Sequence, residues 1–344
     1  MSGHLVAAYH HEVPVLQGLF GALAQLTPLR SVEPAWRLPP GTGEQPDLCM
    51  PTTGLGQLLR GRRLTRLFQG AGGFIGTRPD QIRWQRQTGA MPFWYHVADD
   101  YRTYNRDWEA ADLALLRQAR QVFAVSRALA HSLCERAGLP PERVTVLPNA
   151  VARGHLPAQV PAVRPLDGRR PVAGVLGRVS SRLRLDWLGH VVEHSPWLDW
   201  VFGGDVERGE LLPQDRPALD HLMHHPRCRF TGRVGYTALE ELATTLDVAV
   251  LPYSGRSTNP LGSPVRLFVH LPLGAPILAT PGCLQLEEFT PLVTMCREPQ
   301  GMVQRLEWLR ARGFDDGLRE QRWITAHRHT WDVRANTLLA ALGR

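Results

Sequence analysis

Short apolar runs alternate with stretches of helical periodicity along the whole chain. Such runs, bounded by glycine, proline or polar residues, are typical of buried strands in parallel sheets, and the stretches between them of crossover helices. In the first half the pattern predicts strands at LVAAYH (5–10), GFIGT (73–77), FWYHVA (93–98), QVFAVS (121–126) and RVTVLP (143–148). In the second half it predicts them at PVAGVLG (171–177), LDWVFG (198–203), RCRFTG (227–232), DVAVLPY (247–253), APILAT (275–280) and PLVTMC (291–296).

Two complete strand–helix series indicate an α/β protein with two Rossmann-like domains. We expect the first domain at 1–152 and the second at 171–319, joined by a linker at 153–170 that is rich in proline and lacks amphipathic period. The tail from about 320 to 344 has helical period and no further strand. Within the first domain a helix is expected over 128–137, with Ser126 as its N-cap and Gly138 just beyond its end.

Length and composition agree with this organisation. A chain of 344 residues exceeds what one hydrophobic core normally serves, and 43% apolar with 21% charged residues is typical of a globular protein. No apolar run approaches the roughly 18–20 residues that cross a bilayer. The beginning of the sequence also lacks the layout of a signal peptide, so we expect a cytoplasmic protein.

All 39 basic residues are arginine, and the formal net charge is +7. Phosphate contacts must therefore come from arginine or from backbone N–H groups. The charge suits phosphorylated ligands, an anionic membrane surface or nucleic acid, but no nucleic-acid-binding motif is present, so a nucleic acid partner is not expected. Five scattered cysteines without a CxxC pair, and histidines without ligand spacing, predict neither a disulfide framework nor a metal site.

The stretch from Leu251 to Thr280 is the strongest candidate for ligand chemistry. A predicted strand ends at Pro252, a loop of small residues follows, and Ser263 and Pro264 stand where a helix should begin. Free N–H groups and the dipole at such a helix start attract anions, and Arg266 in the first turn can add a bidentate phosphate contact. An ordinary capped helix would give the same local pattern, so the residues alone leave both interpretations open.

This stretch resembles a segment of the family 4-like glycosyltransferases of the GT-B fold, S-P-x-K-x-x-E-x-x-A-x-G-x-P-v-v-a-T. The matching positions are Ser263, Pro264, Arg266 in place of lysine, Gly274, Pro276 and Thr280. Other stretches match the family in the same order, namely FAVSRALAHSLCERAGLPPERVTVLPNAV (123–151), VLGRVSSRLRLDWL (175–188), FTGRVGYTALEELATTLDVAVLPY (230–253) and HTWDVRANTLLAAL (329–342). WYHVADDY (94–101) resembles the subgroup that makes cell-surface and teichuronic-acid-type polymers.

The resemblance implies a GT-B fold, in which two Rossmann-like domains with parallel sheets face a central cleft and a C-terminal helix crosses back to the first domain. It implies a metal-independent, retaining glycosyltransferase that moves a sugar from a nucleoside-diphosphate sugar to a hydroxyl acceptor in glycan, glycolipid or other glycoconjugate biosynthesis. The nucleotide-sugar is a co-substrate, and no cofactor is expected. The residues implied to hold the donor are Gly177, Arg178, Arg182, Arg233, Val234, Tyr236, Tyr253, Ser263, Pro264, Val265 and Arg266.

Two departures from the family pattern concern the donor ribose. The glutamate that grips the ribose in the family is Val269 here, and the family's earlier glutamate falls at Leu261. Other groups must then hold the ribose, or donor binding is weak or lost. The loss of both glutamates supports one alternative to sugar transfer, a GT-B-shaped nucleotide- or glycan-binding scaffold without turnover. A nucleotide-sugar epimerase is a weaker alternative, because the same fold can host that chemistry.

The first half offers candidate catalytic residues at predicted strand ends, in two groups: His96, Asp99 and Asp100, and His10 and His11. Each group could supply a general base or orient a sugar hydroxyl, and a purely structural hydrogen bond is equally compatible with the pattern. A basic run with apolar residues among its members could meet an anionic membrane or a lipid-linked acceptor at the inner face of the cell membrane, or could be a solvated helix face. Its members are Arg60, Arg62, Arg63 and Arg66.

Overall fold

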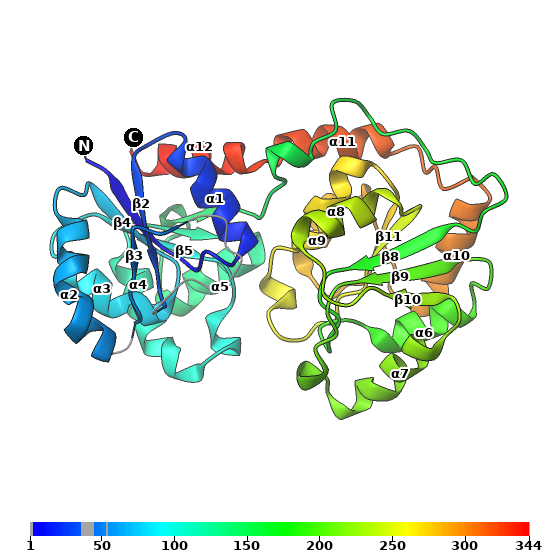
Figure 1. Cartoon of the computed structure of the whole chain (residues 1–344), viewed down its shortest axis with the longest axis horizontal. Coiled ribbons are helices and arrows are strands. Elements are labelled where there is room, and N and C mark those ends of the chain that lie inside the picture. The colour runs from blue at the N-terminus through cyan, green and yellow to red at the C-terminus, as the bar shows by residue number, and fades with distance from the viewer. Residues whose placement is uncertain (1–2, 36–44, 53, 344) are drawn as a thin grey trace. The chain divides into compact units, whose positions relative to one another are not determined.

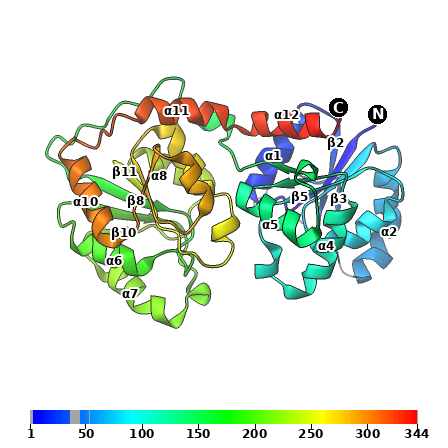
Figure 2. The ribbon, with the colours of Figure 1, turned by 180° about the vertical axis from the view of Figure 1, so that it is seen from behind.

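The computed structural model describes residues 3–35, 45–52 and 54–343, apart from the side chains of 54–59, Arg153 and Tyr236. The chain folds into two compact units, each built on one parallel sheet (Figures 1 and 2). Unit 1 comprises residues 1–150, 261–263 and 330–344, and unit 2 comprises residues 151–260 and 264–329. The predicted α/β class with two parallel sheets is confirmed.

The sheet of unit 1 has the strand order β3-β2-β1-β4-β5-β6-β7, with all neighbouring strands parallel. Five of these strands are predicted by the sequence pattern, and β2 and β3 are not. The strands are β1 (Leu5–Ala8), β2 (Leu29–Glu33), β3 (Leu48–Cys49), β4 (Gly73–Gly76), β5 (Phe93–Val97), β6 (Gln121–Ala124) and β7 (Val144–Val146).

Successive residues of these strands point to opposite faces of the sheet, and helices cover both faces. Ala7 and Ile75 belong to a core that includes residues of α1 and α12, whereas Val6 and Phe74 belong to a core with residues of α2 to α5. In Figure 1 the red α12 lies beside the blue α1, which it contacts. The helices are α1 (Pro14–Ala24), α2 (Gly54–Phe68), α3 (Ile82–Gln87), α4 (Glu109–Gln118), α5 (Arg127–Ala137) and α12 (Trp331–Ala341).

Helix α5 has the caps that the sequence predicts. The Ser126 hydroxyl accepts a hydrogen bond from the Leu129 N–H at 3.0 Å, and Gly138 adopts a left-handed φ of 65° just beyond the helix. The same hydroxyl donates to the Leu261 carbonyl at 2.6 Å. This contact joins Leu261, far along the sequence, to unit 1.

The sheet of unit 2 has the strand order β10-β9-β8-β11-β12-β13, again with all neighbours parallel. The sequence pattern predicts every one of these strands. They are β8 (Val172–Leu176), β9 (Asp199–Gly203), β10 (Cys228–Phe230), β11 (Val248–Leu251), β12 (Ile277–Ala279) and β13 (Val293–Met295).

Helices also cover both faces of this sheet. Trp200 and Val250 are buried beneath α6, α7 and α10, whereas Val201 and Ala249 are buried on the face that carries α8, α9 and α11. The helices are α6 (Leu185–Glu193), α7 (Arg216–His224), α8 (Tyr236–Thr244), α9 (Val265–His270), α10 (Pro299–Arg310) and α11 (Arg319–Arg328). No helix in the described ranges is both long and apolar enough to cross a membrane.

The tail that we expected to complete the first domain is divided between the units. Helix α11 belongs to unit 2, where the buried Arg322 pairs with Asp316 at 2.8 Å. Helix α12 alone belongs to unit 1, and its Trp331 packs against Gly18 of α1 so closely that a Cβ on Gly18 would lie 2.3 Å from Trp331 Nε1. The expected boundary at 319 is therefore wrong by the length of α11.

The segment expected as a linker at 153–170 is counted with unit 2, which begins at Val151. It lies on the surface of that unit, where the Trp323 Nε1–H donates to the Pro157 carbonyl at 2.9 Å. Leu166 packs against the core beneath α6 and α10. The proline content predicts an irregular segment correctly, but this segment is packed rather than free.

Candidate functional site

The carboxyl ends of β8 and β11 form the switch point of the unit 2 sheet. These neighbouring strands continue to β9 on one side and to β12 on the other, and such a point is where open α/β sheets bind ligands. The loops that follow the two strands are hydrogen-bonded to each other: Arg184 N–H donates to Pro252 O and Ser254 N–H to Arg182 O, both at 2.7 Å. The Asn259 amide adds a bond to Arg182 O at 2.7 Å.

Gly177, directly after β8, occupies a position that strongly favours glycine. Its φ is +93°, and a Cβ there would lie 2.8 Å from Nε of Arg266. Its N–H donates to Gly203 O at 2.6 Å, and a Cβ on Gly204 would lie 2.6 Å from the Gly177 carbonyl oxygen. The backbones that follow β8 and β9 therefore approach each other closely, and the Arg266 guanidinium lies beside them. A phosphate-binding turn requires such a close backbone approach.

Arg266, on α9, contacts candidate donor residues in the loops that follow β8 and β11. Its guanidinium donates to the Arg178 carbonyl and lies 5.2 Å from the centre of the Tyr253 ring. Burial raises the pKa of Tyr253 to about 12, although Arg266 acts in the opposite direction. The Arg178 side chain is 58% exposed and lies 3.4 Å from both Glu207 and Glu210. The structure thus brings Gly177, Arg178, Tyr253 and Arg266 together.

The start of α9 differs from our expectation. The N-cap is Pro264, and no side chain caps the helix. The Ser263 hydroxyl instead accepts from the Asn149 N–H at 3.0 Å, and the Asn149 amide donates to Ser263 O at 2.7 Å. Ser263 therefore binds the chain within unit 1, and the first turn of α9 is formed by Val265 and its successors without a capping oxygen.

Three of the residues implied to hold the donor lie after β10. Arg233 is exposed and Val234 half-buried in the turn that leads to α8, beside Gly232, whose φ is +67°. Tyr236 is the first residue of α8, but its side chain lies outside what the structure describes. Their contact with the donor stays a prediction.

Val269, which replaces the family glutamate, is half-buried. It packs against the apolar cluster of Leu176, Val201, Ala243 and Leu246. A glutamate in the same rotamer would place its carboxylate against this cluster, so the valine is accommodated by local packing.

In unit 1 the corresponding switch point lies between β1 and β4. Glu33, at the end of the adjacent β2, binds both histidines that follow β1, and the sequence analysis does not identify it. The fully buried carboxylate accepts from His10 Nδ1 at 2.6 Å, from the His11 N–H at 2.8 Å and from His11 Nδ1 at 3.1 Å. Burial by itself would raise the pKa of Glu33, but these hydrogen bonds outweigh it and lower the pKa to about 2. The carboxylate is therefore ionised at neutral pH.

The partners of His10 define its tautomer. Arg78 approaches Nε2 of His10 and can only donate, so Nε2 accepts and Nδ1 carries the proton that Glu33 receives. Arg78 also pairs with Asp80 at 2.9 Å. The His10 side chain is 20% exposed, whereas that of His11 is 1% exposed and stacks on Tyr9 at 4.2 Å. Of the two, only His10 is accessible to a ligand.

The other candidate catalytic residues have different surroundings. His96 lies within β5 rather than after it, is 4% exposed, and has a buried Nδ1 without a hydrogen-bond partner among the described residues. Burial lowers its pKa to about 4, so it is neutral. Asp100 holds Arg102 in a bidentate ion pair at 2.7 and 2.8 Å and caps the following turn. Asp99 accepts from the Tyr104 hydroxyl at 2.7 Å.

The basic run lies on α2, where its arginines and its apolar residues differ in burial. Arg62, Arg63 and Arg66 are exposed, and Arg60 donates to the Cys49 carbonyl. Leu64, Leu67 and Phe68 are buried in the core of unit 1. The helix therefore presents charge to its surroundings without apolar side chains from this part of the run.

The sequence comparisons with known proteins point to glycosyltransferases. The model of Glycosyltransferase Family 4 matches residues 86–153. TuaH of Bacillus subtilis (strain 168), named as a candidate teichuronic acid biosynthesis glycosyltransferase, is 22% identical over 246 residues. That match covers 68% of this chain and 59% of TuaH, so the chain spans less than two thirds of this relative.

Solved structures show the same architecture. HepE of Anabaena in complex with UDP matches with a TM-score of 0.76 and 15% identity over the full length of both chains. Its complex with UDP-glucose gives 0.72 and 14%, covering 98% of this chain and 99% of HepE. A glycosyltransferase from Rickettsia africae gives 0.73 and 10%, covering 99% and 97%. The chain therefore has the GT-B fold, as in the Rickettsia africae glycosyltransferase, and its residues 86–153 match the model of Glycosyltransferase Family 4.

Proposed function

We propose that this protein is a glycosyltransferase that moves a sugar from a nucleoside-diphosphate sugar to a hydroxyl acceptor in the synthesis of a glycan, glycolipid or other glycoconjugate. The observation that carries the proposal is the contact of Arg266 with Gly177 and Tyr253 at the switch point of unit 2. A guanidinium beside a glycine with a positive φ is suited to a diphosphate. The UDP and UDP-glucose complexes of HepE support a nucleotide-sugar as the donor.

In this reaction the acceptor oxygen forms a bond to the anomeric carbon of the sugar. The bond from that carbon to the diphosphate oxygen breaks, and its electron pair leaves with the diphosphate. Arg178, Arg266 and the uncapped start of α9 supply positive charge where this negative charge develops. We propose that these groups act without a metal ion and, from the resemblance, that the configuration of the anomeric carbon is retained.

Binding of the diphosphate would require Arg178 to leave its two glutamates. Both ion pairs are long and solvent-exposed, and such pairs contribute about 0–1 kcal/mol. A charge-assisted hydrogen bond to the ligand contributes about 1.5–3 kcal/mol. The exchange therefore favours the diphosphate, and Glu207 and Glu210 position Arg178 in the free protein.

On the acceptor side we propose His10 as the general base. Its Nδ1–H is fixed by the ionised Glu33, so Nε2 presents a lone pair, as in carboxylate–histidine pairs of known enzymes. Arg78 occupies that lone pair here, and an acceptor hydroxyl would take its place. His96 is a weaker candidate because its side chain is buried and its pKa is about 4.

The acceptor's location is a separate proposal. The exposed Arg62, Arg63 and Arg66 of α2 could attract an anionic membrane surface, with about 1 kcal/mol for each charge. Since their apolar neighbours are buried, such binding would be electrostatic and lost at high salt. Co-sedimentation with anionic and with neutral vesicles tests this, and equal binding to both would contradict it.

The decisive experiment combines binding with turnover. A thermal-shift series with UDP, GDP, ADP and dTDP should identify one stabilising base, and the matching nucleotide-sugars should then be consumed with release of that diphosphate. Arg266→Ala should lose the stabilisation, whereas Arg229→Ala, an exposed arginine on β10, should keep it. Binding without consumption of any donor would favour the scaffold, and conversion of one nucleotide-sugar into another would favour the epimerase. No stabilisation by any of the four would overturn the proposal.

A further inference from the structure

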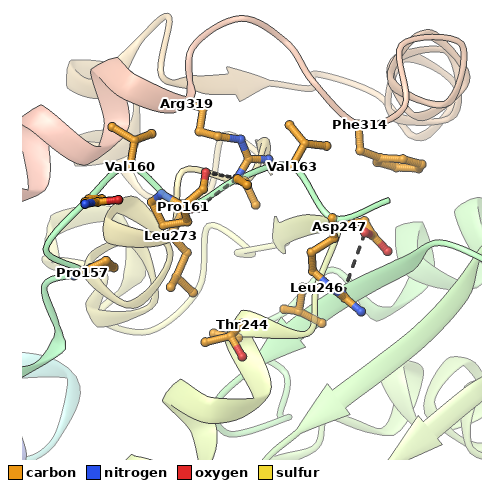
Figure 3. Close-up of a pocket in the computed structure, with 15 residues that line it drawn as sticks. Pro157, Val160, Pro161, Val163, Thr244, Leu246, Asp247, Leu273, Phe314 and Arg319 are labelled. Carbon is orange, nitrogen blue, oxygen red and sulfur yellow. Dashed lines mark hydrogen bonds and ion pairs between the residues drawn. The ribbon is translucent and has the colours of Figure 1, made fainter. Parts of the chain in front are cut away.

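Unit 2 contains a cavity at the end of the sheet opposite to Gly177 and Arg266. Asp247 and Ala275, which line it, stand just before β11 and β12, whereas the candidate donor residues follow β8 and β11. The cavity has a volume of about 390 Å³, within the ~300–1,000 Å³ typical of small-molecule sites. Figure 3 shows that the segment from Pro157 to Val163 runs along one side of it.

The walls of this cavity are mainly apolar. Val160 and Val163 come from the segment that follows unit 1 in the chain, Leu246 from the turn after α8, and Leu273 from the turn after α9. Phe314, which is 1% exposed and belongs to the same core cluster as residues of α10, also lines the cavity. Apolar walls contributed by separate elements are typical of sites that enclose the body of an organic ligand.

The polar group that lacks a full set of partners is Arg319, the first residue of α11. Its Nη1 donates to Leu273 O at 3.2 Å and to Pro161 O at 3.4 Å, but its Nε is buried without a hydrogen-bond partner in the described part of the chain. Burial lowers the pKa of Arg319 below its usual range. A buried N–H without an acceptor lowers the stability of the fold, and an anionic oxygen of a ligand would accept its hydrogen bond.

Three acidic side chains lie nearby. Asp315 acts electrostatically on Arg319 and accepts from the Gly317 N–H at 3.0 Å. Asp247 holds Arg169 in a bidentate ion pair at 2.6 and 2.7 Å. Nη1 of Arg164 lies 3.9 Å from Oδ1 of the same aspartate. Asp316 pairs with the buried Arg322 at 2.8 Å. Of the charged side chains that line the cavity, two are arginines, Arg164 and Arg319, and one is an aspartate, Asp247, so the local charge favours an anion.

We propose that this cavity binds a small amphipathic organic anion, with its carboxylate or phosphate on Arg319 and its apolar body against Val160, Leu246 and Phe314. The site takes a different class of ligand from the donor site and lies at the other end of the sheet. It therefore stands independently of the proposed sugar transfer.

Isothermal titration calorimetry of the full chain with octanoate and octyl phosphate tests this proposal, with octanol as the neutral probe. At least one anion should bind saturably, octanol should bind roughly tenfold more weakly or worse, and saturating UDP should not displace the anion. The stronger of the two anions identifies the head group. Absence of saturable binding by both, or competition with UDP, would overturn the proposal.

Matched variants locate the binding. Arg319→Gln should weaken binding of the anion roughly tenfold or more. Arg229→Gln, on the exposed side of β10, should leave the affinity for the anion unchanged. Val163→Trp fills the cavity from the exposed segment and leaves the hydrogen bonds of Arg319 in place, so it tests the site even if Arg319→Gln unfolds. Equal affinity in wild type and Val163→Trp would show that the anion binds elsewhere.

Discussion

Replacing Glu33 by glutamine removes the charge at the centre of the unit 1 cluster. The hydrogen bonds from His10 and His11 hold the pKa of Glu33 at about 2, against an ordinary value of 4.5. At about 1.36 kcal/mol for each pH unit, a difference of about 2.5 corresponds to about 3 kcal/mol of folding free energy at neutral pH. Because the pKa is lowered on folding, this stabilisation is complete above pH 4.5 and is lost as the pH falls toward 2.

Urea unfolding followed by tryptophan fluorescence, at several pH values from 7 down to 3, measures this contribution. Glu33→Gln should be less stable than wild type by up to about 3 kcal/mol at pH 7, and the gap should shrink by roughly half at pH 3, since the wild-type carboxylate loses its advantage there. Glu12→Gln, an exposed neighbour, is the control. A gap below about 1 kcal/mol at pH 7, or one that stays constant with pH, would refute this account of the cluster.

Three further substitutions test the donor site. Arg266→Ala should weaken nucleoside-diphosphate binding by about 1.5–3 kcal/mol in calorimetry without affecting the nucleoside, and equal losses for both would mark a structural arginine. Gly177→Ala, which forces a Cβ to within 2.8 Å of Arg266 Nε at a φ of +93°, should cost about 1–3 kcal/mol of stability and reduce nucleotide binding, and an unchanged melting temperature would contradict the crowding. Val269→Glu should lower the melting temperature because its carboxylate would meet the apolar cluster that includes Leu246 and Ala243. A variant that keeps its melting temperature and binds the nucleotide more tightly would instead show that the donor ribose binds beside residue 269.

The strands that the sequence predicts and those it misses differ in burial. Strands such as β4 and β11 are buried throughout and appear as continuous apolar runs. Strand β2, LRSVE, buries only its last two residues, and its arginine is exposed, so it has no apolar run to detect. Glu33 ends that strand, and its role depends on side chains that approach from the loop after β1. The key carboxylate of unit 1 was therefore missed together with its strand.

The donor residues of unit 2 are implied by the family resemblance and not by the strand pattern, and their role in donor binding stays a prediction. The structure does bring Gly177 and Arg266 together. Ser263 was placed wrongly at the helix start because its hydroxyl is taken by Asn149, more than a hundred residues earlier. A local pattern contains no information about such a competitor.

The return of α12 to unit 1 affects how the protein emerges from the ribosome. The apolar face of α1, including Leu19 and Phe20, is completed by Ala335 and Leu338. Those residues are synthesised about 180 positions after Ala150, and at about 5–20 residues per second the delay is roughly 10–40 s. Unit 2 is complete before unit 1 closes, so vectorial synthesis leaves the first-made unit with an uncovered apolar stripe until the last helix arrives.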